Sequence, residues 1–283
     1  MNDPVGLVGV GKMGEALLVR LIGAGKRVRA FDIMDTAMQA ARAGGAETVA
    51  SAAEAARGAK IVHVFVHNDD KVFEATLGRG GVLAGAGPGA TVILHSTILP
   101  ATTQRVAETA AGQGVRVIDA PVTSIPRLVR AGKATFLVGG SDDVVAQVRP
   151  HLEALGRAVW HFGPLGAGNA AKLAKNLTNV IERVMWVEAL TLVAAAGIDA
   201  RRFIEMVQSL EKSSAIEEWE KIVRIEGGRV APQMAGGLFR KDVQHAARLA
   251  RELGLALALT QGAADTTARW LAERAGETRD AAD

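Results

Sequence analysis

The feature that most constrains this chain is a glycine-rich turn between a strand and a helix near the N-terminus. An apolar run over residues 5–10 predicts a strand, and it leads into the pattern G-x-G-x-x-G at Gly9–Gly14. A helical pattern over residues 15–25 follows, and then a second predicted strand over residues 27–32, which ends in Asp32. Strand, glycine turn, helix, strand and acid in this order are the fingerprint of a dinucleotide-binding unit.

Each residue of this turn has an expected part in binding the dinucleotide. Gly9 allows the tight turn, Gly11 lets the backbone approach a pyrophosphate, and Gly14 allows the helix to pack closely on the strand. Lys12 and Met13 lie where the helix begins, and the N–H groups of a helix N-terminus bind phosphate. The turn therefore supplies five candidate cofactor-binding residues.

Asp32 indicates which dinucleotide is bound. A carboxylate at this place accepts hydrogen bonds from the ribose hydroxyls of NAD and repels the 2′-phosphate of NADP. Ile33 and Met34 follow Asp32, and neither can bind that phosphate as an arginine would. We therefore expect NAD rather than NADP.

Strands alternate with helices over the first part of the chain. After the two strands named above, runs that predict strands lie at residues 47–50, 61–66, 91–94, 115–119, 135–138 and 158–162. This alternation predicts an α/β Rossmann-type domain with a doubly wound parallel sheet over residues 1–164. The ligand site of such a sheet lies beyond the carboxyl ends of its strands, where Val66, His67 and Ser96 are found.

The remainder of the chain shows no clear strand. We expect an all-helical domain over residues 165–283, joined to the first domain by one long helix over residues 165–196. The tail over residues 273–283 is polar and rich in alanine, and we expect it to fray.

Composition excludes several classes of protein. The 283 residues include no cysteine, which rules out disulfides, thiolate metal sites and cysteine nucleophiles. The net charge is only +3, the basic residues are scattered and aromatics make up 4%, which argues against a nucleic-acid partner. No apolar run is long enough to span a membrane, and no signal sequence precedes the first strand. We expect a cytoplasmic protein.

Lys172 is the first candidate for catalysis. It lies close to the N-terminus of the long predicted helix, where the positive end of the helix dipole disfavours its proton. A lysine whose pKa is lowered in this way can exchange protons near neutral pH. Asn176 lies four residues later and shares a face of the helix with Lys172. Taken alone, this pattern also fits an ordinary surface lysine.

Four separated motifs resemble those of the β-hydroxyacid dehydrogenase family, of which 3-hydroxyisobutyrate dehydrogenase is a familiar member. They are the glycine turn Gly9–Gly14, the segment Asp119–Val122, the glycines and polar residues of Gly163–Asn176, and the pair Lys241–Asp242. The resemblance extends over nearly the whole chain, and four motifs in the right order are far more specific than any one of them.

The resemblance implies a hydride transfer between NAD and the alcohol carbon of a small hydroxy acid. It makes Lys172 the general acid/base and Asn176 a catalytic residue that also orients the substrate. It places Ser96 close to the nicotinamide ribose and brings Lys241 over the cofactor region. The resemblance also implies a homodimer or homotetramer, which the alanine-rich faces of the second domain favour.

The chain departs from the family in the substrate motif, which usually runs Asp-Ala-Pro-Val-Ser-Gly-Gly. Here Thr123, Ser124 and Ile125 follow Val122, so both glycines are absent. The hydroxyls of Thr123 and Ser124 are candidate substrate-binding groups. Arg127, and alternatively Arg130, is a candidate for a bidentate contact to a carboxylate, sulfonate or phosphate. We therefore expect a substrate that differs from the usual small hydroxy acids.

The histidines carry weaker predictions. His67 either contacts the adenosine side of the cofactor or lies in the loop or cap before the next helix, and we favour the cap or loop because Asn68 and Asp69 are good N-cap residues. His63 lies in an apolar strand and His95 at a strand end, and we expect both to be structural. The six histidines show no spacing with carboxylates that suggests a metal site.

Two other functions stay open on the sequence alone. An enzyme on the same scaffold could reduce an imine, although family members that do so generally lack the lysine that this chain has at position 172. A dinucleotide-binding protein without catalysis is the other alternative, and the retention of Lys172 together with Asn176 argues against it.

Overall fold

The computed structural model describes residues 3–210, 223–226, 229–232, 243–244, 247, 250–251 and 254–280. The chain divides into two compact units, Met1–Leu177 and Thr178–Asp283. This division falls inside α8 (Ala167–Ala195), the long helix that the sequence predicted over residues 165–196. Our own division at residues 164 and 165 stays a prediction.

The first unit contains a parallel sheet of six strands in the order β3-β2-β1-β4-β5-β6. The strands are β1 (Val5–Val8), β2 (Val28–Phe31), β3 (Glu47–Thr48), β4 (Ile61–Val64), β5 (Thr91–Leu94) and β6 (Arg116–Asp119). The order reverses between β1 and β4, so the connections that leave their carboxyl ends run in opposite directions and leave a crevice where ligands bind. The doubly wound sheet that the sequence predicted is confirmed.

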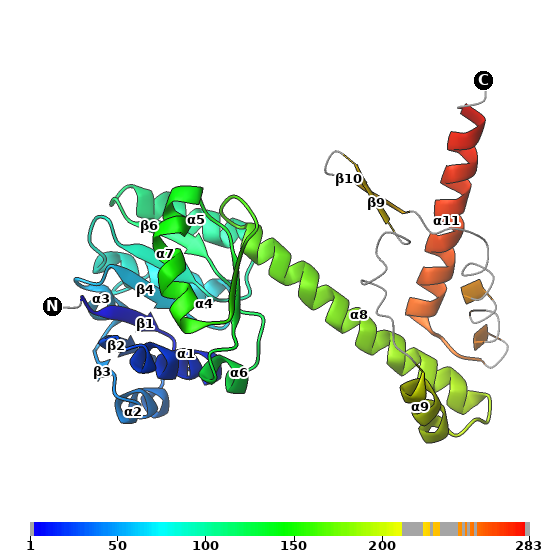
Figure 1. The fold of residues 1–283 in the computed structure, drawn as a ribbon, viewed down its shortest axis with the longest axis horizontal. Helices are drawn as coiled ribbons and strands as arrows, with labels where there is room; N and C mark the ends of the chain where they lie inside the picture. Colours follow the sequence, from blue (N-terminus) through cyan, green and yellow to red (C-terminus); the bar gives the residue numbers. More distant parts are fainter. Residues whose placement is uncertain are drawn as a thin grey trace. The chain divides into compact units, whose positions relative to one another are not determined.

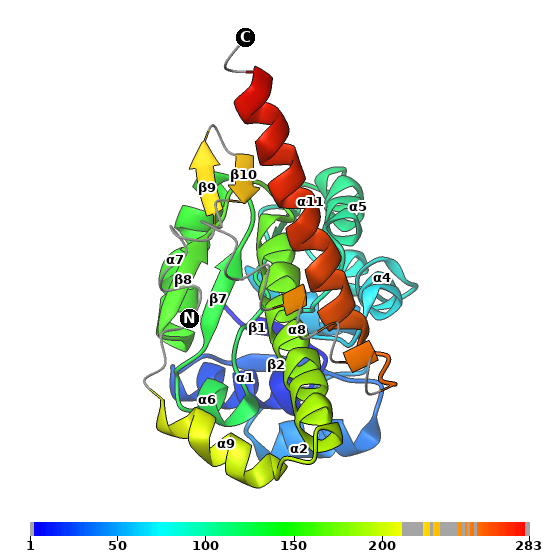
Figure 2. The same cartoon turned by 90° about the vertical axis from the view of Figure 1, so that its right-hand side faces the viewer.

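Helices cover both faces of this sheet (Figure 1). They are α1 (Lys12–Gly23), α2 (Asp35–Ala43), α3 (Ala52–Ala56), α4 (Asp69–Leu77), the 3₁₀ helix η1 (Val82–Ala84), α5 (Pro100–Ala111), α6 (Pro126–Arg130) and α7 (Asp142–Leu155). The helices α1 and α6 lie side by side in both views, and α4 lies beside α5 (Figures 1 and 2).

Both faces of the sheet are buried, which explains why its strands are apolar at nearly every position. One core cluster joins α1, α2 and α7 to one face, and a second joins α3, α4 and α5 to the other. Along β1, Leu7 belongs to the first cluster and Val8 to the second, because successive side chains of a strand point to opposite faces. A strand buried on both faces must be apolar at every position.

Two strands predicted in the main sheet lie outside it. The strands β7 (Thr135–Val138) and β8 (Ala158–His161) form a separate parallel pair. This pair meets the main sheet through isolated antiparallel bridges from Asp119 to Gly139 and from Val122 to Phe136. The chain reverses after β6, so these bridges bring the segment that follows β6 against β7.

Among the described residues of the second unit, a pair of strands is found besides the helices. The antiparallel pair β9 (Val223–Glu226) and β10 (Arg229–Pro232) corrects our expectation that no strand follows residue 166. The sequence signal was a short alternation of apolar and charged residues around two glycines, a pattern typical of hairpins.

A buried carboxylate ties two helices of the second unit together. Glu188 of α8 accepts hydrogen bonds from the backbone N–H groups of Leu259 and Thr260, which begin α11 (Ala258–Asp280). Asp199 is exposed and caps its own helix, α9 (Ala200–Ser209), by accepting from the N–H of Arg202. α11 continues to Asp280, in a stretch whose alanine, glutamate and arginine residues favour a helix. A frayed tail over residues 273–283 stays a prediction.

Candidate active site and cofactor cavity

The glycine turn has the geometry that the fingerprint predicts. Gly9 takes a φ of 91°, and a Cβ atom there would lie 2.4 Å from the carbonyl oxygen of Phe65. A Cβ atom on Gly14 would lie 2.0 Å from the carbonyl oxygen of Gly9, so α1 packs against the turn only without a side chain at this position. Gly11, by contrast, faces open space. The backbone beside Gly11 is therefore accessible to a ligand.

A cavity of about 730 Å³ lies at the carboxyl ends of β1, β2 and β4. Its lining includes five of the predicted cofactor residues, which are Gly9, Gly11, Asp32, Val66 and His67. The other residues of the turn have different places: Lys12 is exposed, Met13 is half-buried against the core, and Gly14 is buried. The volume and the mixed apolar and polar walls suit a nucleotide.

Asp32 is fixed by two backbone donors at the edge of this cavity. Its carboxylate accepts hydrogen bonds from the N–H of Val10 over 2.6 Å and from the N–H of Met34 over 2.9 Å. The structure also adds a residue that sequence reasoning missed, because Arg79, which follows α4, lines the same cavity. The segment after Asp32 lacks an arginine, as we noted, but the fold brings one close from elsewhere.

Ser96 links two neighbouring strand ends from a buried position. Its hydroxyl donates to the carbonyl oxygen of Val66 over 2.6 Å and accepts from the N–H of Val66 over 3.2 Å. Asn68, and not His67, caps α4 through the N–H of Lys71, so the capping residue is one place later than His67. His67 lines the cavity instead.

The N-terminus of α8 is held by Asp119, the last residue of β6. Its two carboxylate oxygens accept hydrogen bonds from the N–H of Gly166 over 2.7 Å and from the N–H of Asn169 over 2.6 Å. Burial raises the pKa of Asp119, while these hydrogen bonds lower it. The side chain of Asn169, which the sequence did not single out, is buried between Thr103 and the carbonyl oxygen of Ser96.

Lys172 follows one turn later and is 8% exposed. Its Nζ atom donates to the carbonyl oxygen of Val122 over 2.7 Å. Burial lowers the pKa of Lys172, and the nearby charge of Lys175 lowers it further. This cause differs in part from the helix dipole that the sequence suggested. Asn176 is half-buried on the same helix.

The segment between Val122 and α6 differs from a glycine loop. The N–H of Thr123 donates to the carbonyl oxygen of Thr135 over 3.0 Å, and Ile125 takes an extended φ of −111° before α6 begins. No left-handed conformation is therefore needed here. The hydroxyl oxygen of Ser124 is buried and has no hydrogen-bond partner among the described residues.

The two candidate arginines lie on α6, a helix that the sequence analysis did not predict. Arg127 is exposed. Arg130 pairs with Glu15 of α1, which makes it a link between two helices and leaves it a poor candidate for binding substrate. Lys241 lies outside the residues that the structure describes.

A chain of three histidines runs beside the site. His63 Nδ1 lies 2.7 Å from His95 Nε2, and His63 Nε2 lies 2.9 Å from His151 Nε2. His95 Nδ1 lies 2.7 Å from the carbonyl oxygen of Ala120, which can only accept, so His95 donates there. The expectation that His63 and His95 are buried structural residues matches this arrangement.

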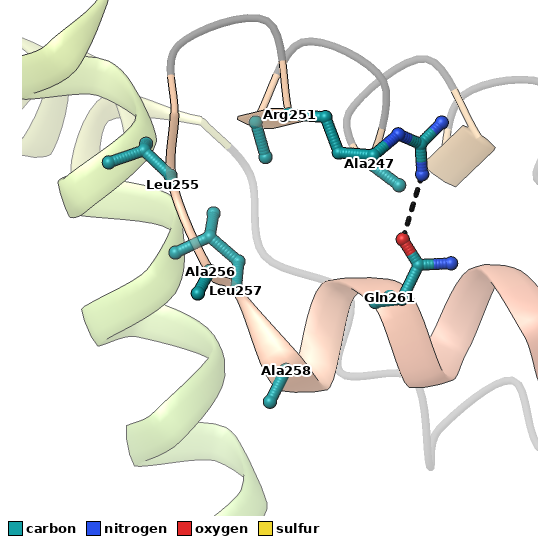
Figure 3. A pocket seen from close by; sticks show the side chains of 8 residues that line it. Ala247, Arg251, Leu255, Ala256, Leu257, Ala258 and Gln261 are labelled. Carbon is teal, nitrogen blue, oxygen red and sulfur yellow. Dashed lines mark hydrogen bonds between the residues drawn. The ribbon is translucent and has the colours of Figure 1, made fainter.

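Metal sites, a second cavity and membrane-spanning helices were also sought among the described residues. No group of three or more metal-binding side chains is found among them. A smaller cavity of about 300 Å³ in the second unit has mostly alanine and leucine walls, with one hydrogen bond between Arg251 and Gln261 over 2.8 Å (Figure 3). Within the part of the chain that the structure describes, no helix is long and apolar enough to cross a membrane.

Two family models match the chain end to end. Residues 4–163 match the NAD binding domain of 6-phosphogluconate dehydrogenase, and residues 166–283 match the model described as NAD-binding of NADP-dependent 3-hydroxyisobutyrate dehydrogenase. These matches fit the glycine turn and the cavity in the first unit.

Similar proteins include two well-covered relatives. The chain is 33% identical over 267 residues to 3-hydroxyisobutyrate dehydrogenase of Pseudomonas aeruginosa, covering 94% of this chain and 88% of that protein. It is 31% identical over 255 residues to 2-(hydroxymethyl)glutarate dehydrogenase of Eubacterium barkeri, covering 89% and 81%.

Solved structures agree with this relationship. The structure of Mycobacterium tuberculosis 3-hydroxyisobutyrate dehydrogenase with L-serine superposes with a TM-score of 0.69 at 28% identity, covering 96% of this chain and 94% of that one. An imine reductase from Myxococcus stipitatus has a TM-score of 0.78 at 18% identity and covers 98% and 95%, which shows a shared fold alone. The chain belongs to the β-hydroxyacid dehydrogenase family, the NAD-binding oxidoreductases similar to 3-hydroxyisobutyrate dehydrogenase.

Proposed function

We propose that this enzyme oxidises a 3-hydroxy acid with NAD, or reduces the corresponding semialdehyde, and that Lys172 is its general acid/base. The observation that carries the proposal is the position of Lys172. Its side chain is buried one turn into α8, and its Nζ atom is held at the carbonyl oxygen of Val122, beside the predicted substrate residues Thr123 and Ser124.

The cavity at the glycine turn fits a dinucleotide. The open space over Gly11 admits a pyrophosphate to the first N–H groups of α1, and Asp32 offers a carboxylate to ribose hydroxyls. Bound NAD would supply the hydride acceptor for oxidation of the alcohol carbon. Ser96 holds the ends of two strands together next to this cavity, and Lys241 remains a candidate contact from the second domain.

The preference for NAD follows from the charge of Asp32. A 2′-phosphate placed near this carboxylate would be repelled, whereas Arg79 on the same cavity would attract it. We propose that Asp32 dominates, because its carboxylate is fixed by two backbone donors. Tighter binding of NADPH than of NADH in a fluorescence titration would contradict this assignment.

Lys172 moves the proton in the proposed reaction. In oxidation the neutral amine takes the proton of the substrate hydroxyl as the hydride leaves the alcohol carbon. In reduction the ammonium returns a proton to the developing alkoxide. Burial lowers the pKa of Lys172, which brings both protonation states within reach near neutral pH. Asn176, on the same helix, is proposed to orient the substrate by hydrogen bonds.

The substrate is proposed to differ from the plain hydroxy acids of the family. Ser124 and Ile125 stand where a glycine loop has its two glycines, and Pro126, which follows them, has no backbone N–H to offer. The hydroxyl of Ser124 is buried and has no hydrogen-bond partner among the described residues. Ser124 and Thr123 are proposed to contact the substrate, with exposed Arg127 as a contact for an anionic group.

The experiment is a turnover assay at the NADH absorbance band. The substrates are 3-hydroxyisobutyrate, serine, glycerate, 3-hydroxypropionate, bulkier aryl 3-hydroxy acids and hydroxy-sulfonates, with NADP in parallel. Lys172→Ala is expected to lower kcat by a factor of about 10² to 10⁴, with the Kd of NADH unchanged. Lys175→Ala, three residues later on α8, is the matched control and should keep its turnover at its own pH optimum.

The outcomes separate the alternatives. Turnover of an imine and of no hydroxy acid would favour the imine reductase. Binding of NADH without turnover of any compound would favour a non-catalytic dinucleotide-binding protein. If a plain small hydroxy acid is turned over as rapidly as any bulkier or sulfonated one, the proposal of a non-standard substrate is contradicted.

We also infer a homodimer or homotetramer. The exposed side chains of α8 include Leu173, Leu177, Ile181 and Met185, which are spaced by four residues and so share one face of the helix. Light scattering of the purified protein tests this inference, and a monomer at micromolar concentration would contradict it. A cytoplasmic location remains a prediction of the cysteine-free sequence.

A further inference from the structure

The segment that follows β6 makes two separate contacts with α8. Asp119, at the end of the strand, accepts from the N–H groups of Gly166 and Asn169 at the start of the helix. Val122, three residues later, accepts from the Nζ atom of Lys172 one turn further along. The short segment from Asp119 to Val122 thus holds both the start of α8, through the Asp119 carboxylate, and the side chain of Lys172, through the Val122 carbonyl oxygen.

The fit between Asp119 and α8 depends on two glycines. A Cβ atom on Gly168 would lie 2.8 Å from Asp119 Oδ2 and 2.2 Å from the carbonyl oxygen of Leu137. A Cβ atom on Gly139 would lie 2.4 Å from Asp119 Oδ1. The carboxylate is fully buried, so water cannot replace its hydrogen bonds. The first turn of α8 therefore packs closely against the Asp119 carboxylate and the backbone of Leu137 and Gly139.

The geometry points to Asp119 as a positioning residue that sets the place of Lys172 in the reaction. This inference rests on the proposed function of Lys172. Asp119 does not touch the reacting atoms in this account. It anchors the first turn of α8 to the same segment that holds the Nζ atom, so a loose helix end would let the amine move relative to the hydroxyl that it must reach. A displacement of about 1 Å can lower a rate by about a hundredfold.

The amide groups involved provide a direct test of the contact. Ala167 begins α8, so the N–H of Asn169 lies in the first turn and has no carbonyl partner within the helix. Slow hydrogen exchange of the amides of Gly166 and Asn169 in the wild-type protein is therefore expected only with Asp119 in place. Fast exchange at these amides, measured by NMR or by mass spectrometry of short peptides, would overturn the inference.

The kinetic test uses Asp119→Asn, which keeps the shape but turns one acceptor into a donor that faces an N–H group. We expect kcat to fall about tenfold or more, with the Kd of NADH unchanged. We also expect the acidic limb of the pH profile for oxidation to move to higher pH, because an amine released from its buried place regains its proton more readily. If the substitution only lowered the amount of folded protein, the activity would fall by the same factor at every pH, and the acidic limb of the pH profile would not move.

Asp199→Asn is the control. Asp199 caps α9 through the N–H of Arg202, so it is also a carboxylate at a helix N-terminus, but α9 carries no proposed catalytic group. Its kcat and pH profile should stay close to those of the wild type. An Asp119→Asn enzyme that is folded and matches Asp199→Asn in kcat and in pH profile would overturn the inference.

A second variant covers the case in which Asp119→Asn does not fold. Gly168→Ala disturbs the same contact from the helix side and should lower kcat and move the pH profile in the same direction. A folded Gly168→Ala enzyme with wild-type kcat would overturn the inference. Failure of the proposed function would look different, since Lys172→Ala would then keep its turnover.

Discussion

The Nζ atom of Lys172 lies 2.7 Å from the carbonyl oxygen of Val122, and this hydrogen bond joins α8 to the segment that carries the predicted substrate residues. A carbonyl oxygen accepts strongly from an ammonium and more weakly from a neutral amine, so the contact is open to the side chain in both protonation states. The lysine is thus fixed in position while it remains able to change its charge.

The pH dependence of the reaction should report on Lys172 and Lys175. Oxidation needs a neutral amine, so kcat/KM for the hydroxy acid should rise as the pH rises through the lowered pKa of Lys172. Reduction needs the ammonium, so its rate should fall over the same range. In Lys175→Met the like charge is gone, the pKa of Lys172 rises, and both limbs should move to higher pH. Lys133→Met, an exposed site on another segment, should leave them in place.

The glycine turn allows stability and cofactor affinity to be separated. Gly14→Ala would place a methyl group 2.0 Å from the carbonyl oxygen of Gly9, so we expect a loss of about 1 to 3 kcal/mol in the free energy of unfolding. Gly11→Ala has free space around its Cβ atom and an ordinary φ of −66°, so its stability should stay near wild type. Its methyl group would occupy the space proposed for the pyrophosphate.

Urea unfolding of Gly14→Ala and Gly11→Ala measures the free energy of unfolding, and titration with NADH measures the Kd of the cofactor. We expect the Kd of NADH to rise about tenfold or more in Gly11→Ala, which corresponds to about 1.4 kcal/mol. Unchanged NADH affinity in that variant would show that the pyrophosphate lies elsewhere.

The histidine chain should make the protein sensitive to acid. Burial, followed by the neighbouring histidines, lowers the pKa of His63 well below its usual value, and burial lowers the pKa of His95 and His151 to about 4. Unfolded histidine takes up a proton near its ordinary pKa of 6.5, so the unfolded state binds more protons between pH 6.5 and about 4. The stability that these neutral histidines contribute should therefore be complete above pH 6.5. The free energy of unfolding should fall as the pH drops from 6.5 to about 4.

Each histidine that stays neutral should contribute a slope of up to about 1.4 kcal/mol per pH unit. His151→Gln removes the partly exposed member of the chain, and its unfolding free energy should fall less steeply with acid than that of the wild type. Urea unfolding at pH 7.5, 6.0 and 5.0 gives both slopes. Equal slopes in the two proteins would show that His151 is already protonated when folded.

The two arginines of α6 should differ in their effect on substrate binding. Arg130 pairs with Glu15, so Arg130→Ala should cost less than about 1 kcal/mol of stability and leave KM unchanged. Arg127 is exposed and is proposed to contact an anionic substrate, so Arg127→Ala should raise KM by about tenfold while kcat stays the same. A rise in KM for Arg130→Ala alone would reverse this assignment.

Local patterns were sufficient to predict much of the fold. The glycine turn, the apolar strands and the acid at position 32 predict the Rossmann-type domain, because turn geometry and two-sided burial act on neighbouring residues. The pairing of β9 with β10 and the separation of the β7–β8 pair from the main sheet were missed. Both depend on how short strands pair, and pairing is decided by contacts between residues far apart in the chain.

The candidate site was likewise predicted in part from local sequence motifs, while its remaining contacts are seen only in the tertiary structure. The sequence by itself predicted the cofactor turn, Asp32 at the end of the second strand, and Lys172 on its helix, since each lies in a motif with its own local geometry. Only the tertiary structure decided that Asp119 holds the start of α8, that Arg79 enters the cofactor cavity and that Arg130 turns to Glu15. Hydrogen bonds and ion pairs of this kind join residues that the sequence separates widely, and their partners are chosen by packing and burial, which no local pattern contains.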